Sequence, residues 1–136
     1  MSEAEKKGFD LSNNFDVVMA RQHARELART MGFGLTDQTR IATAVSEVAR
    51  RAVENQGHIS FVVVTEGPRR GVECTCLGCQ WIESPPGVPT GEVLGGLRGV
   101  ERLMDEFEVQ NKETGRPVIV MRKWLKLNPV VGSGGS

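Results

Sequence analysis

The stretch Thr36-Asp-Gln-Thr-Arg-Ile-Ala-Thr-Ala-Val-Ser-Glu-Val-Ala-Arg-Arg-Ala52 decides the fold. Its larger apolar residues recur at spacings of four, three and four, at Ile41, Val45, Val48 and Ala52. That spacing puts them on one face of a helix, which predicts that this face packs against a core. The Thr36 hydroxyl can cap the helix start, where Asp37 meets the positive end of the helix dipole, and Gly57 is expected to end the helix.

A second amphipathic helix is predicted on the N-terminal side of this stretch. Its apolar residues also recur at helical spacing, at Val17, Ala20, Ala24, Leu27, Ala28 and Met31. Asn14 or Asp16 can cap this helix, and Gly32 and Gly34 can end it. Before it, Phe9–Leu11 predicts a short strand, and residues 1–8 are expected to be a flexible terminus.

The periodicity changes from helical to alternating after Gly57. Residues 59–65 and 72–77 alternate around a turn at 67–71, which predicts a hairpin. Residues 78–96 then hold five glycines and three prolines. Because so long an irregular stretch is uncommon inside a compact domain, it favours a functional loop.

The C-terminal part predicts one more helix and a closing hairpin. The helix is expected at residues 97–107, the hairpin strands at 107–110 and 117–124, and a flexible tail at 126–136. The elements together predict one α/β domain over residues 9–125, an α+β two-layer sandwich with its helices on one face of a sheet.

The composition is that of an ordinary globular domain. Of 136 residues, 39% are hydrophobic and 25% are charged, and seventeen Lys and Arg balance seventeen Asp and Glu. This balance lacks the excess positive charge on which binding to nucleic acid or to an anionic membrane depends. No apolar run approaches the ~20 residues that span a bilayer, and the first residues are unlike a signal peptide. We therefore expect a cytoplasmic protein that binds neither nucleic acid nor membrane.

Four segments together resemble the RsbT-type switch serine kinases of bacterial stress-signalling complexes. The segments Asp16–Ala28 and Asp37–Arg50 resemble the front half of these kinases, and Arg102–Glu108 and the strand ending Arg122-Lys-Trp124 resemble the back half. The resemblance covers about residues 9–125. It implies the Bergerat-type, histidine-kinase-like ATPase fold of gyrase, heat-shock chaperone, histidine kinase and MutL proteins, with a mixed sheet.

The same resemblance implies a function and a set of partners. A switch kinase phosphorylates a serine on a STAS-domain scaffold and, once released, activates a downstream phosphatase. The family holds Mg-ATP with three short motifs, so each motif can be compared with this chain.

The first motif pairs a Glu and an Asn four residues apart on the second helix, where they share a face. The Glu orients or deprotonates the attacking hydroxyl, and the Asn oxygen ligates magnesium. Glu47 matches the Glu, whereas Arg51 stands at the Asn position. A guanidinium has no lone pair for a metal, so Arg51 disfavours magnesium. Alternatively, Arg51 clamps phosphate oxygens directly in place of the metal.

The second motif is an Asp that accepts the adenine amino hydrogen, followed by two alternate glycines that let the backbone approach the ring. The alignment puts Gly78 at the Asp, and Gln80 and Ile82 at the glycines, with Trp81 between them. The adenine anchor is therefore missing. We expect Trp81 to fill the former adenine pocket, with an exposed partner anchor as the other interpretation.

The third motif alternates glycines before a helix whose free N–H groups receive phosphates. Gly95, Gly96 and Leu97 keep part of this motif, but the alternation is lost. A loop-to-helix turn that binds no ligand explains the same residues equally well.

All three motifs depart from the family pattern while the framework segments match. We therefore predict a pseudo-kinase that regulates by binding a STAS-domain protein or a PPM-type phosphatase, with no cofactor, no metal site and a vestigial Glu47. The alternative is an active serine/threonine kinase that uses ATP and magnesium, with Glu47 as base. Self-association as a homodimer stays open.

Two further groups of residues carry their own hypotheses. Cys74 and Cys76 alternate on a strand and are expected to face the core as small apolar residues. Cys79, in the loop, is expected to be exposed, which suggests a thiol sensor as a third function. A basic helix face could meet an acidic partner surface or simply be solvated, and it comprises Arg21, Arg25, Arg29, Arg50 and Arg51.

Overall fold

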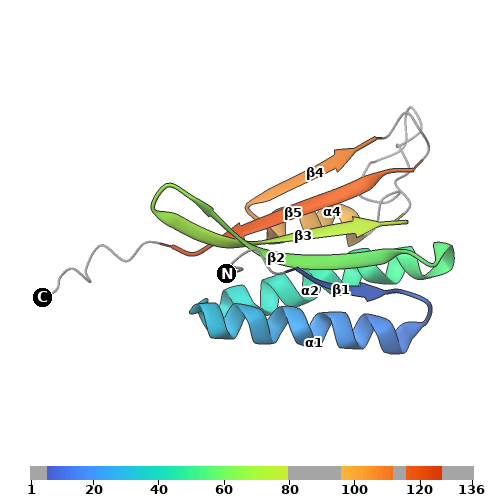
Figure 1. The fold of residues 1–136 in the computed structure, drawn as a ribbon, viewed down its shortest axis with the longest axis horizontal. Coiled ribbons are helices and arrows are strands. Elements are labelled where there is room, and N and C mark those ends of the chain that lie inside the picture. The colour runs from blue at the N-terminus through green and yellow to red at the C-terminus, as the bar shows by residue number, and fades with distance from the viewer. Residues whose placement is uncertain (1–5, 80–95, 112–115, 127–136) are drawn as a thin grey trace, which may run out of the picture.

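A computed structural model of the chain describes residues 6–79, 96–111 and 116–126. Helices and strands follow one another along the chain in the predicted order (Figure 1). The elements are β1 (Lys7–Asp10), α1 (Asn14–Met31), α2 (Leu35–Ala52), the 3-10 turn η1 (Val53–Asn55), β2 (His58–Glu66), β3 (Arg69–Leu77), α4 (Gly96–Leu103), β4 (Glu106–Gln110) and β5 (Val118–Trp124).

The five described strands form one sheet in the order β1-β2-β3-β5-β4, with the helices on one of its faces (Figure 1). This confirms the predicted α/β class and two-layer arrangement. The expectation of a mixed sheet is corrected, because all four described pairings are antiparallel. The crossover through α4 makes β4 run in the same direction as β3, but β5 lies between the two and pairs with both.

Several predicted boundaries shift for local reasons. Helix α1 starts one residue after Asn13, whose side chain accepts from Asp16 N–H, while the Asp16 carboxylate accepts from Asn13 N–H. This reciprocal capping box replaces the predicted caps. Gly32 ends α1 in the left-handed conformation, as expected. Helix α2 begins at Leu35 after Gly34, not at Thr36, and no side chain caps it.

The remaining elements also differ in length from the prediction. Strand β1 begins at Lys7, inside the segment expected to be a flexible terminus. Helix α2 ends at Ala52 and continues as η1, so Gly57 follows the turn instead of ending the helix. Helix α4 ends at Leu103, four residues earlier than predicted, and Phe107 lies in β4. The predicted tail beyond residue 126 lies outside the described residues.

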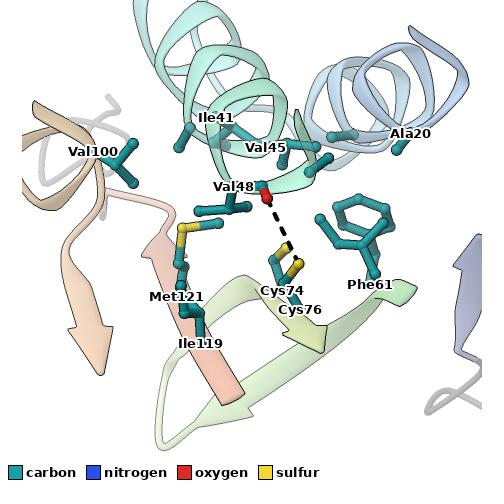
Figure 2. Packing of buried hydrophobic residues seen from close by; sticks show 14 of the residues in the cluster. Ala20, Ile41, Val45, Val48, Phe61, Cys74, Cys76, Val100, Ile119 and Met121 are labelled. Atoms are coloured by element: carbon teal, nitrogen blue, oxygen red, sulfur yellow. Dashed lines mark hydrogen bonds between the residues drawn. The ribbon is translucent and has the colours of Figure 1, made fainter. Parts of the chain in front are cut away.

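The apolar face of α2 packs on the middle of the sheet, as its spacing predicts (Figure 2). Val45 and Val48 are fully buried against β3 and β5, whose inward residues include Cys74, Cys76 and Met121. The Cys76 thiol lies 3.9 Å from the carbonyl oxygen of Val48. The two strand cysteines therefore pack as small core residues, which confirms their predicted orientation.

The buried cation of Lys123, on the sheet, contacts residues of α2 and α4. The Lys123 side chain on β5 is 5% exposed and donates to the carbonyl oxygen of Leu103, 2.9 Å away. Its amine also lies 3.7 Å from the Asp37 carboxylate and 3.5 Å from that of Asp105. A buried amine needs such partners, because an unpaired buried charge is strongly destabilising.

A half-buried histidine lies where β1 meets α1. The His23 ring is 5.4 Å from the rings of both Phe9 and Phe61, measured between centroids. Burial lowers the pKa of His23, and the neighbouring Lys7 charge lowers it further. The folded protein therefore favours the neutral imidazole.

We expect Lys123→Met to lower the free energy of unfolding by about 3 kcal/mol, because it leaves the Asp105 carboxylate and the Leu103 carbonyl without their cation and leaves Asp37 with Arg40 alone. Urea denaturation measures the change. The matched control is Lys126→Met, at an exposed lysine two residues beyond β5, which should change stability by no more than about 0.5 kcal/mol. Equal stability of the two variants would show that the contacts of Lys123 do not stabilise the fold.

Above about pH 6.5, the ordinary pKa of histidine, we expect His23 to have no effect on the free energy of unfolding. Below that pH, we expect His23 to lower the free energy of unfolding. The sign follows because the unfolded chain binds the proton at a higher pH than the folded chain. Urea denaturation at pH 7.5 and 5.5 should give a smaller difference for His23→Gln than for the unaltered protein. An equal difference in the two proteins would contradict the effect of His23 on stability.

Candidate functional site

Glu47 lies in the second half of α2, between the buried residues Ser46 and Val48. Its carboxylate is paired with Arg50, at 3.0 Å between Oε2 and Nη1, and its side chain is 31% exposed. A partly exposed carboxylate on a rigid helix can accept a proton from a hydroxyl group that approaches from solvent. The ion pair holds one carboxylate oxygen of Glu47 beside the Arg50 guanidinium.

Arg51 follows Glu47 by one helical turn and shares its side of α2. The Nε atom of Arg51 is buried, so the base of the guanidinium lies inside the protein and not in solvent. Its charge acts on the thiol of Cys79, just beyond the end of β3. The arginine thus reaches from the last turn of α2 toward the segment in which the sequence comparison places the adenine anchor.

Gly78 directly follows β3 in a backbone conformation that disfavours side chains. Its φ is +90°, and a Cβ atom added to it would lie 2.8 Å from the Cα of Gly57. The Asn55 side chain donates to the carbonyl oxygen of Gly78 over 2.8 Å. The backbone of Gly57 thus occupies the space in which the side chain of a residue at position 78 would begin.

The contribution of Asn55 was not predicted from the sequence. Asn55 closes the turn after α2, and Gly78 lies 23 residues away in the chain, so neither residue type nor spacing connects them. The left-handed conformation of Gln56, at φ +51°, directs the chain from this turn into Gly57.

Cys79 corrects an expectation. It is fully buried, whereas we expected an exposed thiol in a loop. Burial raises the pKa of Cys79 to about 11, although the Arg51 guanidinium opposes the shift by favouring the thiolate. Burial also raises the pKa of Cys74 and of Cys76. Because reactive cysteines are exposed and ionise readily, the geometry of Cys79 does not suit a thiol sensor.

An open pocket of about 600 Å³ lies at this end of the sheet. Asn55, Leu77, Gly78 and Cys79 form one side of it, and Asn111 and the start of β5 form the other, with Arg116, Pro117 and Val118. The pocket therefore adjoins the backbone contact at Gly78 but has neither Glu47 nor Arg51 among its lining residues.

The third predicted motif is described only in part. Helix α4 begins at Gly96, which agrees with a helix start at that motif. Gly95 lies outside the described residues, as do Gln80, Trp81 and Ile82, and the side chain of Leu97 is likewise not described. The prediction that Trp81 fills an adenine pocket therefore remains a prediction.

The donor atoms of the described site do not suit the magnesium and ATP that the resemblance implies. Arg51 supplies only donors and a positive charge at the position of the metal ligand. Gly78 supplies no side-chain acceptor for an adenine amino group, and its surroundings exclude one. Among residues 6–79, 96–111 and 116–126, no three His, Cys, Asp or Glu side chains are grouped so as to hold a metal ion.

Comparison with known proteins gives one close relative and a similar fold. Over 130 residues the chain is 32% identical to the serine/threonine-protein kinase RsbT of Bacillus subtilis (strain 168), which covers 85% of this chain and 94% of that protein. No protein-family model matches the chain. In the described residues, no helix has the length and apolar character needed to cross a membrane.

The fold is similar to one in the crystal structure of the RsbU and RsbW domains of Rv1364c from Mycobacterium tuberculosis. The TM-score is 0.60 at 19% sequence identity, so this likeness concerns the fold alone. It covers 88% of this chain and 32% of the mycobacterial chain, so this protein spans about a third of that structure. The likeness agrees with the predicted histidine-kinase-like fold.

We expect Gly78→Ala to lower the free energy of unfolding by about 2–4 kcal/mol, because it combines a left-handed backbone with a contact against Gly57. Gly32→Ala is the matched control, since Gly32 has φ +102° but open space around its Cβ position. It should lose only about 1 kcal/mol. Thermal and urea denaturation compare the two, and equal losses would show that the contact with Gly57 does not matter.

Proposed function

The chain belongs to the family of the serine/threonine-protein kinase RsbT, and we propose that it is a pseudo-kinase of that family. In this proposal it binds ATP weakly or not at all and regulates by reversible binding to a partner protein. The catalytic function of Glu47 is then vestigial. The protein acts in the cytoplasm.

The observation that supports this proposal most strongly is the position of Arg51. It lies one turn after Glu47, on the same side of α2, where the family places the asparagine that ligates magnesium. A cation there repels a divalent ion and cannot replace the missing oxygen ligand. At ~5 Å and an effective dielectric near 20, the repulsion is about 6–7 kcal/mol before screening.

The surroundings of Gly78 support the same proposal independently. A charge-assisted hydrogen bond to the adenine amino group contributes about 1.5–3 kcal/mol, which corresponds to roughly 10- to 150-fold in affinity. The backbone at Gly57 leaves no room for the side chain that would accept this bond. Arg51 therefore disfavours magnesium and Gly78 disfavours adenine, for different physical reasons.

The partner in this proposal is a STAS-domain scaffold or antagonist, or a PPM-type phosphatase. The helices and strands that resemble the family are retained in the described structure, so the surface of the framework can still recognise a protein. The retained Glu47 supports one other function, that of an active serine/threonine kinase phosphorylating a STAS-domain protein, with Arg51 holding phosphate oxygens.

We expect calorimetry to detect no ATP binding tighter than about 1 mM, which corresponds to about −4 kcal/mol, with or without magnesium. RsbT of Bacillus subtilis, measured in the same buffers, is the positive control. Micromolar, magnesium-dependent binding would overturn the pseudo-kinase proposal.

A phosphorylation assay with a STAS-domain protein tests the alternative function directly. Transfer of phosphate that is lost in Glu47→Gln but kept in Glu54→Gln would establish an active kinase. Glu54 is an exposed glutamate in η1, so it serves as the matched control. We expect no transfer with the unaltered protein.

A further inference from the structure

Exposed apolar side chains gather on the outer face of α1. Phe15, Val18 and Met19 are 67%, 38% and 39% exposed, and they follow the helical spacing i, i+3, i+4. In the described part of the chain, only Leu35 and Leu77 are also large, apolar and exposed. Single exposed apolar residues are ordinary, whereas a group on one face marks an interaction site.

A groove of about 630 Å³ adjoins these residues, between α1 and β1. Met19 belongs to the exposed apolar group and also lines the groove, and Phe9 of β1 adds a second apolar side chain to the groove. The α1 residues that line it run from Met19 to Arg29, a distance of about 15 Å along the helix axis. We call the groove together with Phe15 and Val18 the α1 surface.

The charged residues of the α1 surface are mainly positive. Lys7, Arg25 and Arg29 line the groove together with one carboxylate, that of Glu26. Glu26 and Arg29 form an ion pair with each other, which leaves the charges of Lys7 and Arg25 without a carboxylate in the described structure. Because the whole chain is neutral, this surface is a local excess of positive charge.

We propose that the α1 surface binds an acidic amphipathic helix of a partner protein. Apolar residues on that helix would pack on Phe15, Val18 and Met19, and its carboxylates would pair with Arg25 and Lys7 in the groove. A helix suits this surface because the exposed apolar residues form a short ridge on α1. A ridge of this kind packs into a groove between the side chains of a second helix. The inference rests on the proposed partner-binding function and assigns it a surface and a partner chemistry.

Charge and shape favour this occupant over two others. A second copy of the chain would bring the same arginines to the interface, where they would oppose cations or apolar residues. An anionic membrane would attract the arginines, but a bilayer surface cannot fill a groove between a helix and a strand. A helix with acidic and apolar residues satisfies both the charge and the groove.

The test uses a fluorescein-labelled peptide of 18 residues, with Leu at i, i+3, i+4 and i+7 spacing and Glu at the other helix positions. Fluorescence anisotropy should show saturable binding to the full chain that weakens as salt is added. A peptide with every Glu replaced by Lys should not bind. Equal binding of both peptides, or of neither, would overturn the proposal.

Variants of the full chain then locate the site. Phe15→Ser and Arg25→Glu should each weaken binding of the acidic peptide at least about tenfold. The matched controls lie elsewhere: Leu35→Ser, at a residue 70% exposed, and Arg70→Glu, at an exposed arginine in β3. Controls that weaken binding as much as the α1 variants would overturn the assignment to this surface.

Two further measurements exclude the other occupants. Sedimentation with phosphatidylserine vesicles should leave the protein in solution, and ultracentrifugation should show no dimer that Phe15→Ser dissociates. A positive result in either measurement would assign the α1 surface to a membrane or to a second copy, and would overturn the proposal.

The cognate STAS-domain protein or phosphatase separates this inference from the function on which it rests. If a partner binds the unaltered protein and the Phe15→Ser and Arg25→Glu variants equally, the α1 surface is wrong and the partner-binding function stands. If neither partner class binds the unaltered protein, the proposed function itself fails. We expect binding that both variants weaken.

Discussion

The packing of one face of α2 on the middle of the sheet is the constraint on which the rest of the structure depends. Val45 and Val48 are fully buried against β3 and β5, and the Cys76 thiol lies against the Val48 carbonyl oxygen. This burial fixes the rotation of α2 about its axis. As a result, Glu47 and Arg51, which are one turn apart, share one side of the helix and cannot change their direction without exposing the core.

Much of the fold could be predicted because its signals are local. The spacing of Ile41, Val45 and Val48 is enough to predict the buried face of α2, and the alternation around Cys74 and Cys76 is enough to predict which way β3 faces. The departures concern features that periodicity does not encode. The cap of α1 is Asn13 and not a later residue, because Asn13 and Asp16 exchange hydrogen bonds. Among the described strands no two neighbours are parallel, because β5 enters between β3 and β4, and no single segment reveals this order.

The candidate site could be predicted as residue types but not as geometry. The arginine at position 51 and the glycine at position 78 are evident in the sequence, and the resemblance assigns them their places. That Gly78 is pressed against Gly57 and held by Asn55 is a contact across more than twenty residues, so it requires the folded chain. The burial of Cys79 also depends on contacts that only the folded chain makes. A glycine-rich segment begins at Gly78, yet the fold buries the first residue after it, beside Arg51.

The contact between Gly78 and Gly57 also bears on the evolutionary reversibility of this protein. A single substitution can exchange one side chain for another, but here any new side chain at position 78 would meet the main chain of a neighbouring turn. An acidic residue there would require the turn after α2 to move as well, and with it the hydrogen bond from Asn55 to the carbonyl oxygen of residue 78. A chain of this kind can therefore change more easily at other positions than gain a side chain at position 78.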